Sequence, residues 1–259
     1  MSRIGEQFRT LHKASKPIGF GFGAEVSPRR MLLLVRVAET TAVDVLDVAL
    51  SVANAGVIVS GAEEGTFLQQ VLSKCGGIPI GAWVPPGEGL PSEGAASPLD
   101  FFVCDLDGPS DAITRRDRGC LVEVDAGLDT SRLRAVGELG IDALIVKSGS
   151  LDLGRLSSLV EFRRVHSMSG KPIVLQIGGM IERMQVVALW RAGVDALVID
   201  SAVGAEVLAS IRDTVNSAPF EMRRLETGTY VSIGTQIGAL GESGIREDDE
   251  GEDGEDDDE

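Results

Sequence analysis

Histidine, aromatic residues and paired cysteines are scarce in this chain of 259 residues. The chain has two histidines, three cysteines, two tryptophans and one tyrosine. Zinc sites are built from closely spaced histidines and cysteines, and the sequence contains no CxxC, HxH or HExxH spacing. No GxGxxG follows an apolar run and opens a helix, so a dinucleotide fingerprint is also missing. The sequence therefore predicts a protein that uses neither a metal ion nor an organic cofactor.

Long apolar runs and clusters of basic residues are missing as well. A helix that spans a bilayer needs about 20 consecutive apolar residues, and no stretch of the chain approaches that length. The N-terminal MSRIGEQFRTLHK lacks the apolar core of a secretory signal, and an odd number of unpaired cysteines is typical of reduced thiols. No compact Lys/Arg stripe is present to neutralise phosphates. We therefore expect a cytoplasmic protein that binds neither membranes nor nucleic acids.

Negative charge is concentrated at the C-terminal end. Residues 247–259 hold 11 acidic residues and two glycines, and removing those 11 charges changes the formal net charge from −16 to −5. Like charges without apolar side chains cannot bury enough surface to fold, so we predict a disordered acidic tail over 246–259. This tail is either a solubilising segment or a binding segment for a basic partner. The sequence leaves that choice open, and it leaves self-association into a homo-oligomer open too.

Short runs of Val, Ile and Leu are what the chain has in abundance. Eight runs occur, each followed by a polar or glycine-containing turn and an amphipathic stretch. They are MLLLVRVA (31–38), AGVIVSG (55–61), IPIGAWV (78–84), DFFVCDL (100–106), CLVEVDA (120–126), DALIVKS (142–148), PIVLQIGG (172–179) and DALVIDS (195–201). Near-continuous apolar runs are typical of parallel strands that are buried on both faces. Eight such units close into a barrel, so the sequence predicts an α/β fold, a (β/α)8 TIM barrel.

The remaining segments divide the chain into four parts. Residues 1–30 are expected to form a helix over 5–14 and an aromatic-glycine segment over 17–23 that plugs the base of the barrel. The barrel spans 31–218, an extension follows over 219–245, and the acidic tail ends the chain. Helices are expected over 40–54, 63–74, 110–117, 130–139, 155–168, 182–192 and 205–215. The Gly/Pro-rich stretch 85–98 is either a lid over the barrel mouth or an eroded helix.

Polar residues near the carboxyl ends of the runs mark the predicted mouth of the barrel. Inward-facing and outward-facing residues alternate along a strand. A polar residue near the carboxyl end of a strand therefore faces either the lumen or the surrounding helices. These residues are Arg36, Ser60, Asp105, Glu123, Asp125, Lys147, Gln176 and Asp200. Unpaired buried charges cost several kcal/mol, so two cations and four anions there indicate either a ring of salt bridges or an active site.

Lys147 is the most specific of these residues. A lysine that is partly shielded from water can act as a free amine and attack a carbonyl to form a Schiff base. Asp105, Glu123 or Asp125 would then move the protons of dehydration and bond cleavage. If Lys147 instead pairs with Glu123 or Asp125, it is a poor nucleophile, and the sequence does not decide between these two states.

The stretch GIDALIVKSGS resembles the sixth strand of the class I aldolases of barrel fold, including the deoxyribose-phosphate aldolase group. The resemblance implies that Lys147 is the Schiff-base nucleophile, and it aligns Asp100 with the acid–base aspartate of strand four. In this chain the stretch VLQIGG has Leu175 and Gln176 where the family carries a second lysine.

The stretch from Cys120 to Ser201 is also similar to the C-terminal half of indole-glycerol-phosphate synthase. That resemblance implies that Glu123 corresponds to a catalytic glutamate of strand five, although Lys147 replaces an asparagine. Both families bind phosphate after strands seven and eight, which points to Gly178, Gly179 and Ser201, beside Asp200, as an anion site.

The sequence thus favours a metal-independent lyase or aldolase that acts on a small carbonyl compound, phosphorylated or not, through Lys147. Arg36, Ser60, Gln176 and the anion site would bind the substrate. Two alternatives stay open: a non-catalytic barrel derived from an enzyme, which serves as a binding or scaffold protein, and a Glu123-based isomerase or synthase of phosphorylated sugars.

Overall fold

Eight parallel strands form a closed barrel, with each strand hydrogen-bonded to its neighbours in chain order and β1 paired with β8. The computed structural model describes residues 2–12, 30–61, 66–115, 117–149 and 151–220. The strands are Leu32–Ala38 (β1), Gly56–Ser60 (β2), Ile80–Trp83 (β3), Phe101–Asp105 (β4), Gly119–Asp125 (β5), Ala143–Lys147 (β6), Ile173–Ile177 (β7) and Val194–Asp200 (β8). Each strand coincides with one of the eight apolar runs to within two residues, so the predicted (β/α)8 architecture is confirmed.

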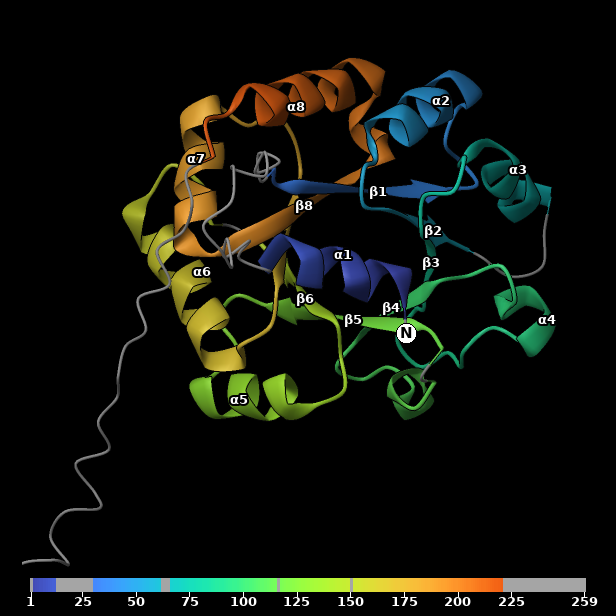
Figure 1. The fold of residues 1–259 in the computed structure, drawn as a ribbon, viewed down its shortest axis with the longest axis horizontal. Helices are drawn as coiled ribbons and strands as arrows, with labels where there is room; N and C mark the ends of the chain where they lie inside the picture. The colour runs from blue at the N-terminus through green and yellow to red at the C-terminus, as the bar shows by residue number, and fades with distance from the viewer. Residues whose placement is uncertain (1, 13–29, 62–65, 116, 150, 221–259) are drawn as a thin grey trace, which may run out of the picture. The chain divides into compact units, whose positions relative to one another are not determined.

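Helices surround the strands, and one further helix lies across the middle of the ring (Figure 1). The α-helices are Arg3–His12 (α1), Val43–Val52 (α2), Thr66–Lys74 (α3), Glu93–Ala96 (α4), Thr130–Glu138 (α5), Leu156–Ser169 (α6), Arg183–Ala192 (α7) and Ala205–Ser217 (α8). Local sequence sets several of their ends. Asp129 caps α5 by accepting from the N–H groups of Ser131 and Arg132, and Gly170 and Gly193 end α6 and α7 in the left-handed conformation.

Apolar side chains fill two layers that the strands separate. Alternate strand residues face outward and pack under the helices, among them Val35, Val57 and Leu175. The other set faces the lumen, where Leu34, Ile58, Phe101, Leu121, Ile145, Val174 and Val198 form a second cluster. Because alternation fixes the face of every strand residue, this inner set also determines which later residues reach the mouth.

Helix α1 closes the amino-terminal end of the barrel. Its Ile4 and Phe8 are fully buried and belong to the lumen cluster. Gly119 begins β5 beneath the helix, and a Cβ atom there would lie 2.6 Å from Ile4 Cγ2, so this close approach requires glycine. The predicted plug over 17–23 lies outside the described residues. The observed closure comes from the helix before it.

Four side chains at the base tie the strands together in pairs. Each lies within two residues of the start of an even-numbered strand, and its side chain accepts from the N–H of the first or second residue of the strand before it. The acceptors are Asn54, Asp100, Asp142 and Asp195, and the donors are the N–H groups of Leu33, Ile80, Cys120 and Ile173, at 2.7, 3.0, 3.1 and 2.9 Å. The Asp-Ala-Leu motif at the start of β6 and β8 therefore supplies two of these four contacts.

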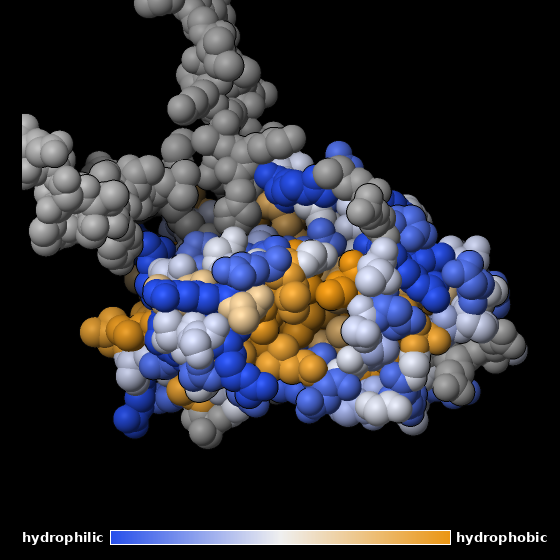
Figure 2. Space-filling model, turned by 90° about the horizontal axis from the view of Figure 1, so that it is seen from below, coloured by the Kyte–Doolittle hydropathy of each residue, from blue (hydrophilic) through white to orange (hydrophobic). Residues whose placement is uncertain are grey.

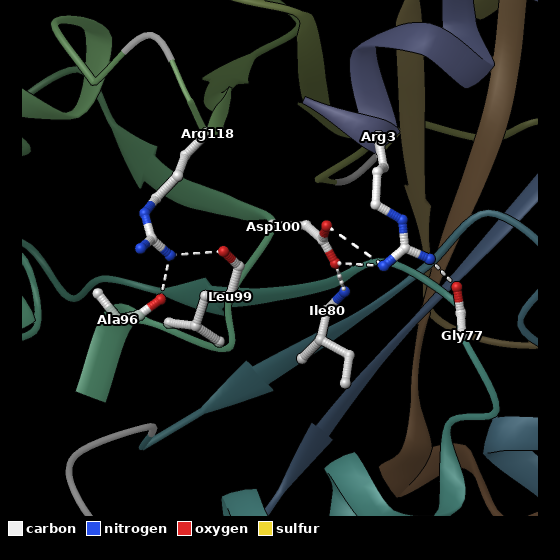
Figure 3. Close-up of polar contacts among 7 residues, drawn as sticks. All are labelled: Arg3, Gly77, Ile80, Ala96, Leu99, Asp100 and Arg118. Carbon is white, nitrogen blue, oxygen red and sulfur yellow. Dashed lines mark hydrogen bonds and ion pairs between the residues drawn. The ribbon is translucent and has the colours of Figure 1, made fainter. Parts of the chain in front are cut away.

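Asp100 belongs to this base, which corrects the role implied by the aldolase resemblance. Figure 3 shows its carboxylate between Arg3 of α1 and the N–H of Ile80. The Arg3 guanidinium lies 3.3 Å from the Asp100 carboxylate and also donates to the Gly77 carbonyl. Asp100 precedes β4 and therefore lies at the opposite end of the strand from the mouth, where chemistry occurs in this fold. Its contacts hold α1 on the barrel.

Two of the segments that connect consecutive strands contain only a four-residue helical turn. The predicted helix over 110–117 is a 3-10 turn over Ser110–Ile113, which follows Gly108 and Pro109. Figure 2 views the molecule from the side on which α5 and this turn lie in Figure 1, and apolar surface gathers there in a hollow bordered by hydrophilic side chains. The strands beneath stay buried nonetheless, since Cys104 and Val122 are 4% and 5% exposed.

In the stretch 85–98 only the four residues of α4 are helical. Ala96 is buried in the outer core, and Leu90 packs against that core, which favours the eroded helix over a lid. Of the predicted extension, only Pro219 and Phe220 are described, and the acidic tail lies outside the described residues. None of the described helices combines the length and the apolar character that crossing a membrane requires.

Candidate functional site

The predicted mouth residues lie at the carboxyl ends of seven strands around one buried carboxylate. Arg36, Asp105, Glu123, Lys147, Gln176 and Asp200 each lie an even number of residues after a member of the lumen cluster on the same strand. By alternation they face the lumen. Glu123 is at the centre of the polar contacts, and it is only 3% exposed.

Three donors converge on Glu123 from three other strands. Arg36 of β1 donates through Nη2 to Oε1, and Lys147 Nζ of β6 lies 3.3 Å from Oε2. Trp83 of β3 donates its indole N–H to the same Oε2 at 3.3 Å. One carboxylate from β5 therefore links strands on both sides of the lumen.

These contacts determine the ionisation of Glu123. Burial raises the pKa of its carboxyl, while the Arg36 guanidinium, the Lys147 ammonium and the Trp83 N–H lower it. The donors prevail, and the pKa lies below the ordinary glutamate value. Glu123 is therefore a carboxylate at neutral pH, and it is the counter-charge that Arg36 and Lys147 share.

Lys147 and Arg36 differ in their access to the mouth. The Lys147 side chain is 41% exposed, whereas the Arg36 side chain is 15% exposed. The Arg36 guanidinium carbon lies 5.5 Å from the centroid of the Trp83 ring, a cation–π contact that fixes its plane. The Arg36 Nε is buried and has no hydrogen-bond partner among the described residues. Lys147 is thus the reachable cation, and Arg36 is the anchored one.

The remaining carboxylates of the predicted ring do not join this cluster. Asp105 accepts from the N–H of Asp107 at 3.0 Å, and Asp200 accepts from the N–H of Ala202 at 2.9 Å. Asp125 is exposed, although its Cα is the register partner of Lys147. Within the described part of the chain, none of the three forms an ion pair with Arg36 or Lys147. Among the described residues, the two cations and four anions therefore do not form a ring of salt bridges: only Glu123 contacts Arg36 and Lys147.

The predicted anion site lies after β7 and β8. Neither Gly178 nor Gly179 has a positive φ, and a Cβ atom at either position would meet no atom within 4 Å. Ser201 is buried, and its hydroxyl lies 2.8 Å from that of Thr41. The space beside the glycines is open. Neither backbone conformation nor crowding by described protein atoms requires glycine there.

Two members of the site were not predicted as site residues. Trp83 lies two residues after Gly81, which packs against the lumen residue Phe101, and this alternation was the available signal. Thr41 follows β1 and reaches Ser201 across the β1–β8 seam, a contact that no motif indicated. Ser60 and Gln176 are half-buried. Among the described residues, no group of three His, Cys, Asp or Glu side chains is placed to hold a metal ion.

Comparisons with known proteins identify the fold. No family model matches the chain, and no curated protein sequence matches it. Solved structures do. One from Aquifex aeolicus VF5 has a TM-score of 0.55 at 14% identity, covering 83% of this chain and 99% of that chain.

Two tryptophan synthase structures are similar to the same extent. The aminoacrylate-bound form from M. tuberculosis has a TM-score of 0.54 at 12% identity and covers 83% of this chain and all of the other. A mutant of the alpha-subunit from Pyrococcus furiosus has a TM-score of 0.52 at 13% identity and covers 72% of this chain and 97% of the other. At such identities the likeness establishes the TIM-barrel fold and leaves the chemistry to the site itself.

Proposed function

We propose that this barrel is a lyase of the aldolase type, which acts on a small carbonyl compound through a Schiff base on Lys147. One observation supports the proposal: the Lys147 side chain is 41% exposed, so a substrate at the mouth can reach its amine. Its contact with Glu123 at 3.3 Å is the pairing that makes a lysine a poor nucleophile, so the reaction requires the substrate to break this contact. Ionisable pairs in a cleft are where catalytic groups are found most often. The amine is both reachable by a substrate and in contact with a proton acceptor.

Glu123 is a weak base while its three donors stabilise the carboxylate. In the proposed reaction the substrate displaces water from the mouth, which raises the pKa of this carboxyl and lets it accept a proton from the Lys147 ammonium. The free amine then attacks the carbonyl carbon, the C–N bond forms, and the carbonyl oxygen leaves as water. Arg36 and Trp83 keep Glu123 in position throughout. Asp105 and Asp125, the Cα partners of Glu123 and Lys147, supply the proton transfers of dehydration and carbon–carbon cleavage.

The open space beside Gly178 and Gly179 suits a substrate with an anionic group. Backbone N–H groups at such turns and at short helix N-termini bind phosphate oxygens, and a side chain in place of either glycine would occupy the space. The Ser201 hydroxyl, at the start of the turn Ser201–Val203, is buried and shares a hydrogen bond with the Thr41 hydroxyl, so it would donate to an anion only after that bond breaks. We therefore extend the proposal to phosphorylated carbonyl compounds.

A second candidate function is a binding barrel that performs no chemistry. The saturation of Glu123 by three donors and its lowered pKa favour this reading, because a stabilised carboxylate is a weak base. The same saturation argues against Glu123 as the general base of an isomerase. In a binding barrel the two cations would hold an anionic ligand, and no covalent adduct would form.

Borohydride trapping separates the two functions. The protein is incubated with a panel of aldehydes, keto acids and their phosphorylated forms, reduced with borohydride, digested and mapped by mass spectrometry. We expect a substrate-dependent mass increase on the peptide that contains Lys147. Lys147→Arg, which keeps a cation beside Glu123 but forms no imine, should abolish the adduct.

Lys171 is the matched control lysine. It lies at the base of the barrel, where its ammonium donates to the Leu139 and Ile141 carbonyls at 3.0 Å each. Lys171→Arg should leave the adduct unchanged. Equal labelling of both lysines, or no adduct with any compound while ligand binding persists in Lys147→Met, would favour the binding barrel.

A further inference from the structure

Cys104 and Cys120 lie side by side on the outer face of the barrel wall. Cys104 is in β4 and Cys120 is in β5, and the Cα partner of Cys104 is Val122, two residues after Cys120. Both cysteines belong to the outer core, which packs under the surrounding segments. Their side chains form a hydrogen bond with each other. The fold therefore brings two of the three thiols of the chain into contact across one strand pair.

The third thiol, Cys75, is a natural reference for this pair. It follows α3 and is 4% exposed, the same fraction as Cys104. Burial raises the pKa of the Cys75 thiol to about 11, and a thiol that keeps its proton is a poor nucleophile. A difference in reactivity between Cys75 and Cys104 therefore reflects the surroundings of Cys104 and not its exposure.

The hydrogen bond gives the two thiols of the pair different chemical roles. Cys120 donates to Cys104, which lowers the pKa of the Cys104 thiol. Burial and the nearby Asp105 and Glu123 carboxylates act against this shift and do not cancel it. The same hydrogen bond, together with burial, raises the pKa of the Cys120 thiol. Cys104 is therefore the thiol that ionises first, while Cys120 keeps its proton.

The cover over this pair is thin. The segment between β4 and β5 contains the 3-10 turn Ser110–Ile113, in which Ala112 is the one fully buried residue. The backbone at Gly108 lies directly against Cys104, because a Cβ atom there would be 2.7 Å from Cys104 Cβ and 3.4 Å from its Sγ. Figure 2 shows an apolar hollow on the side where this turn lies. A segment with so few buried contacts opens locally at a low free-energy cost, which admits a small uncharged molecule.

We propose that Cys104 and Cys120 form a dithiol that hydrogen peroxide converts reversibly into a disulfide. The Cys104 sulfur attacks one peroxide oxygen, an S–O bond forms, the O–O bond breaks, and the second oxygen leaves as water with the Cys104 proton. The Cys120 sulfur then attacks the Cys104 sulfur, an S–S bond forms, and the hydroxyl leaves as water with the Cys120 proton. Both sulfur atoms are oxidised and both peroxide oxygens are reduced, so one peroxide gives one disulfide and two waters.

The barrel wall makes this disulfide easy to reduce. A disulfide holds its sulfur atoms about 2.05 Å apart, which is closer than hydrogen-bonded contact. Cys104 and Cys120 are diagonal neighbours, and diagonal neighbours on paired strands lie farther apart than directly paired residues. The strands β4 and β5 must therefore shift to form the bond, and a strained disulfide is reduced more readily than a relaxed one. We expect an excess of glutathione to restore both thiols.

Peptide mapping of the oxidised full chain tests the proposal. The native protein is treated with a small excess of hydrogen peroxide, free thiols are blocked with iodoacetamide in denaturant, and the chain is digested with trypsin and Glu-C without reduction. Glu93 lies between Cys75 and Cys104, and Arg115 lies between Cys104 and Cys120, so the digest separates the three cysteines. We expect a linked pair of peptides that contains Cys104 and Cys120, and a blocked Cys75. Cys104 should be oxidised about tenfold or more faster than Cys75.

Variants of the pair separate the two roles. Cys120→Ser keeps a hydrogen-bond donor but forms no disulfide, so Cys104 should stop at the sulfenic acid, which dimedone traps. Cys120→Ala also removes the donor and should slow the oxidation of Cys104 about tenfold. Cys75→Ala is the matched control and should form the link at the wild-type rate, with circular dichroism melts confirming the fold of each variant.

Four results would overturn the proposal. They are a link that involves Cys75, equal oxidation rates of Cys75 and Cys104 in the native protein, a link between Cys104 and Cys120 that forms only in denaturant, and a disulfide that glutathione does not reduce. This chemistry is independent of the reaction proposed for Lys147, so neither result decides the other.

Discussion

At the scale of single residues, Glu123 organises the mouth of the barrel. It is the one anion that contacts both lumen cations of the described chain, and it also accepts from Trp83. Removing one partner of a buried ion pair leaves an uncompensated charge, which costs more than the pair itself contributes. The stability of the mouth therefore depends on Glu123 more than on any one of its donors.

We predict that Glu123→Gln lowers the free energy of unfolding by about 3 kcal/mol at neutral pH, because Arg36 then lacks its counter-charge. Lys147→Met should lower it by less than about 1 kcal/mol, because that side chain is 41% exposed and solvent screens its pair. Urea unfolding of both variants measures the difference. Equal losses would contradict the central role of Glu123.

The loss of stability in Glu123→Gln depends on pH, and the pKa of Glu123 determines in which direction. The pKa of Glu123 is lower in the folded protein than its ordinary value of about 4.3, so the carboxylate contributes stability above that pH. The contribution is lost as the pH falls through the folded pKa. The stability difference between the wild type and Glu123→Gln should therefore shrink below about pH 4. A difference that is constant from pH 7 to pH 3 would exclude the ionised state.

Alternation along the strands predicted which of these residues face the lumen, and it did so for Arg36, Glu123 and Lys147. It could not predict which of them touch, because pairing across a lumen depends on the stagger of strands and on side-chain reach. Asp105, Asp125 and Asp200 look equivalent to Glu123 in the sequence. Two of them, Asp105 and Asp200, form hydrogen bonds within their own turns instead.

At the scale of elements, the packing of α5 on α6 depends on one glycine. Gly137 lies in the last turn of α5, and a Cβ atom there would lie 2.1 Å from the Ser169 carbonyl oxygen. Helix propensity alone favours Gly137→Ala by up to about 1 kcal/mol. The contact is with backbone atoms of α6, which cannot move aside without separating the helices.

We therefore predict that Gly137→Ala destabilises the protein by about 1–3 kcal/mol, against its helix propensity. Gly94→Ala is the control, because Gly94 is also helical and its Cβ atom would meet no atom within 4 Å. That variant should be neutral or slightly stabilised. Thermal unfolding by calorimetry measures both changes, and a more stable Gly137→Ala would refute the close approach.

The sequence predicted most of the helices and strands, but it missed the role of α1 and the 3-10 form of the segment after β4. Ile4 and Phe8 lie four residues apart and make α1 amphipathic, which indicates that one face of this helix is buried. The plug was instead predicted at the aromatic-glycine segment 17–23, because the composition of that segment is unusual. The expected helix over 110–117 is a 3-10 turn because the whole connection between Asp105 and Gly119 has 13 residues and begins with Gly108 and Pro109 close after β4. A connection that short leaves little room for a full helix.

At the scale of the whole molecule, the eight apolar runs were sufficient to predict a closed parallel barrel. The Asp-Ala-Leu that begins the sixth and eighth runs supplies two of four similar contacts, in which a side chain at the start of one strand accepts from an N–H of the strand before it.

The most direct test of the Glu123–Lys147 unit is the rate of borohydride-trapped adduct formation on Lys147 in the wild type and in Glu123→Gln. If Glu123 takes the proton that makes the amine nucleophilic, the variant should react about a hundredfold more slowly while Lys147 stays exposed. If both proteins label Lys147 at the same rate, or neither labels it with any carbonyl compound, the two residues form no reactive unit.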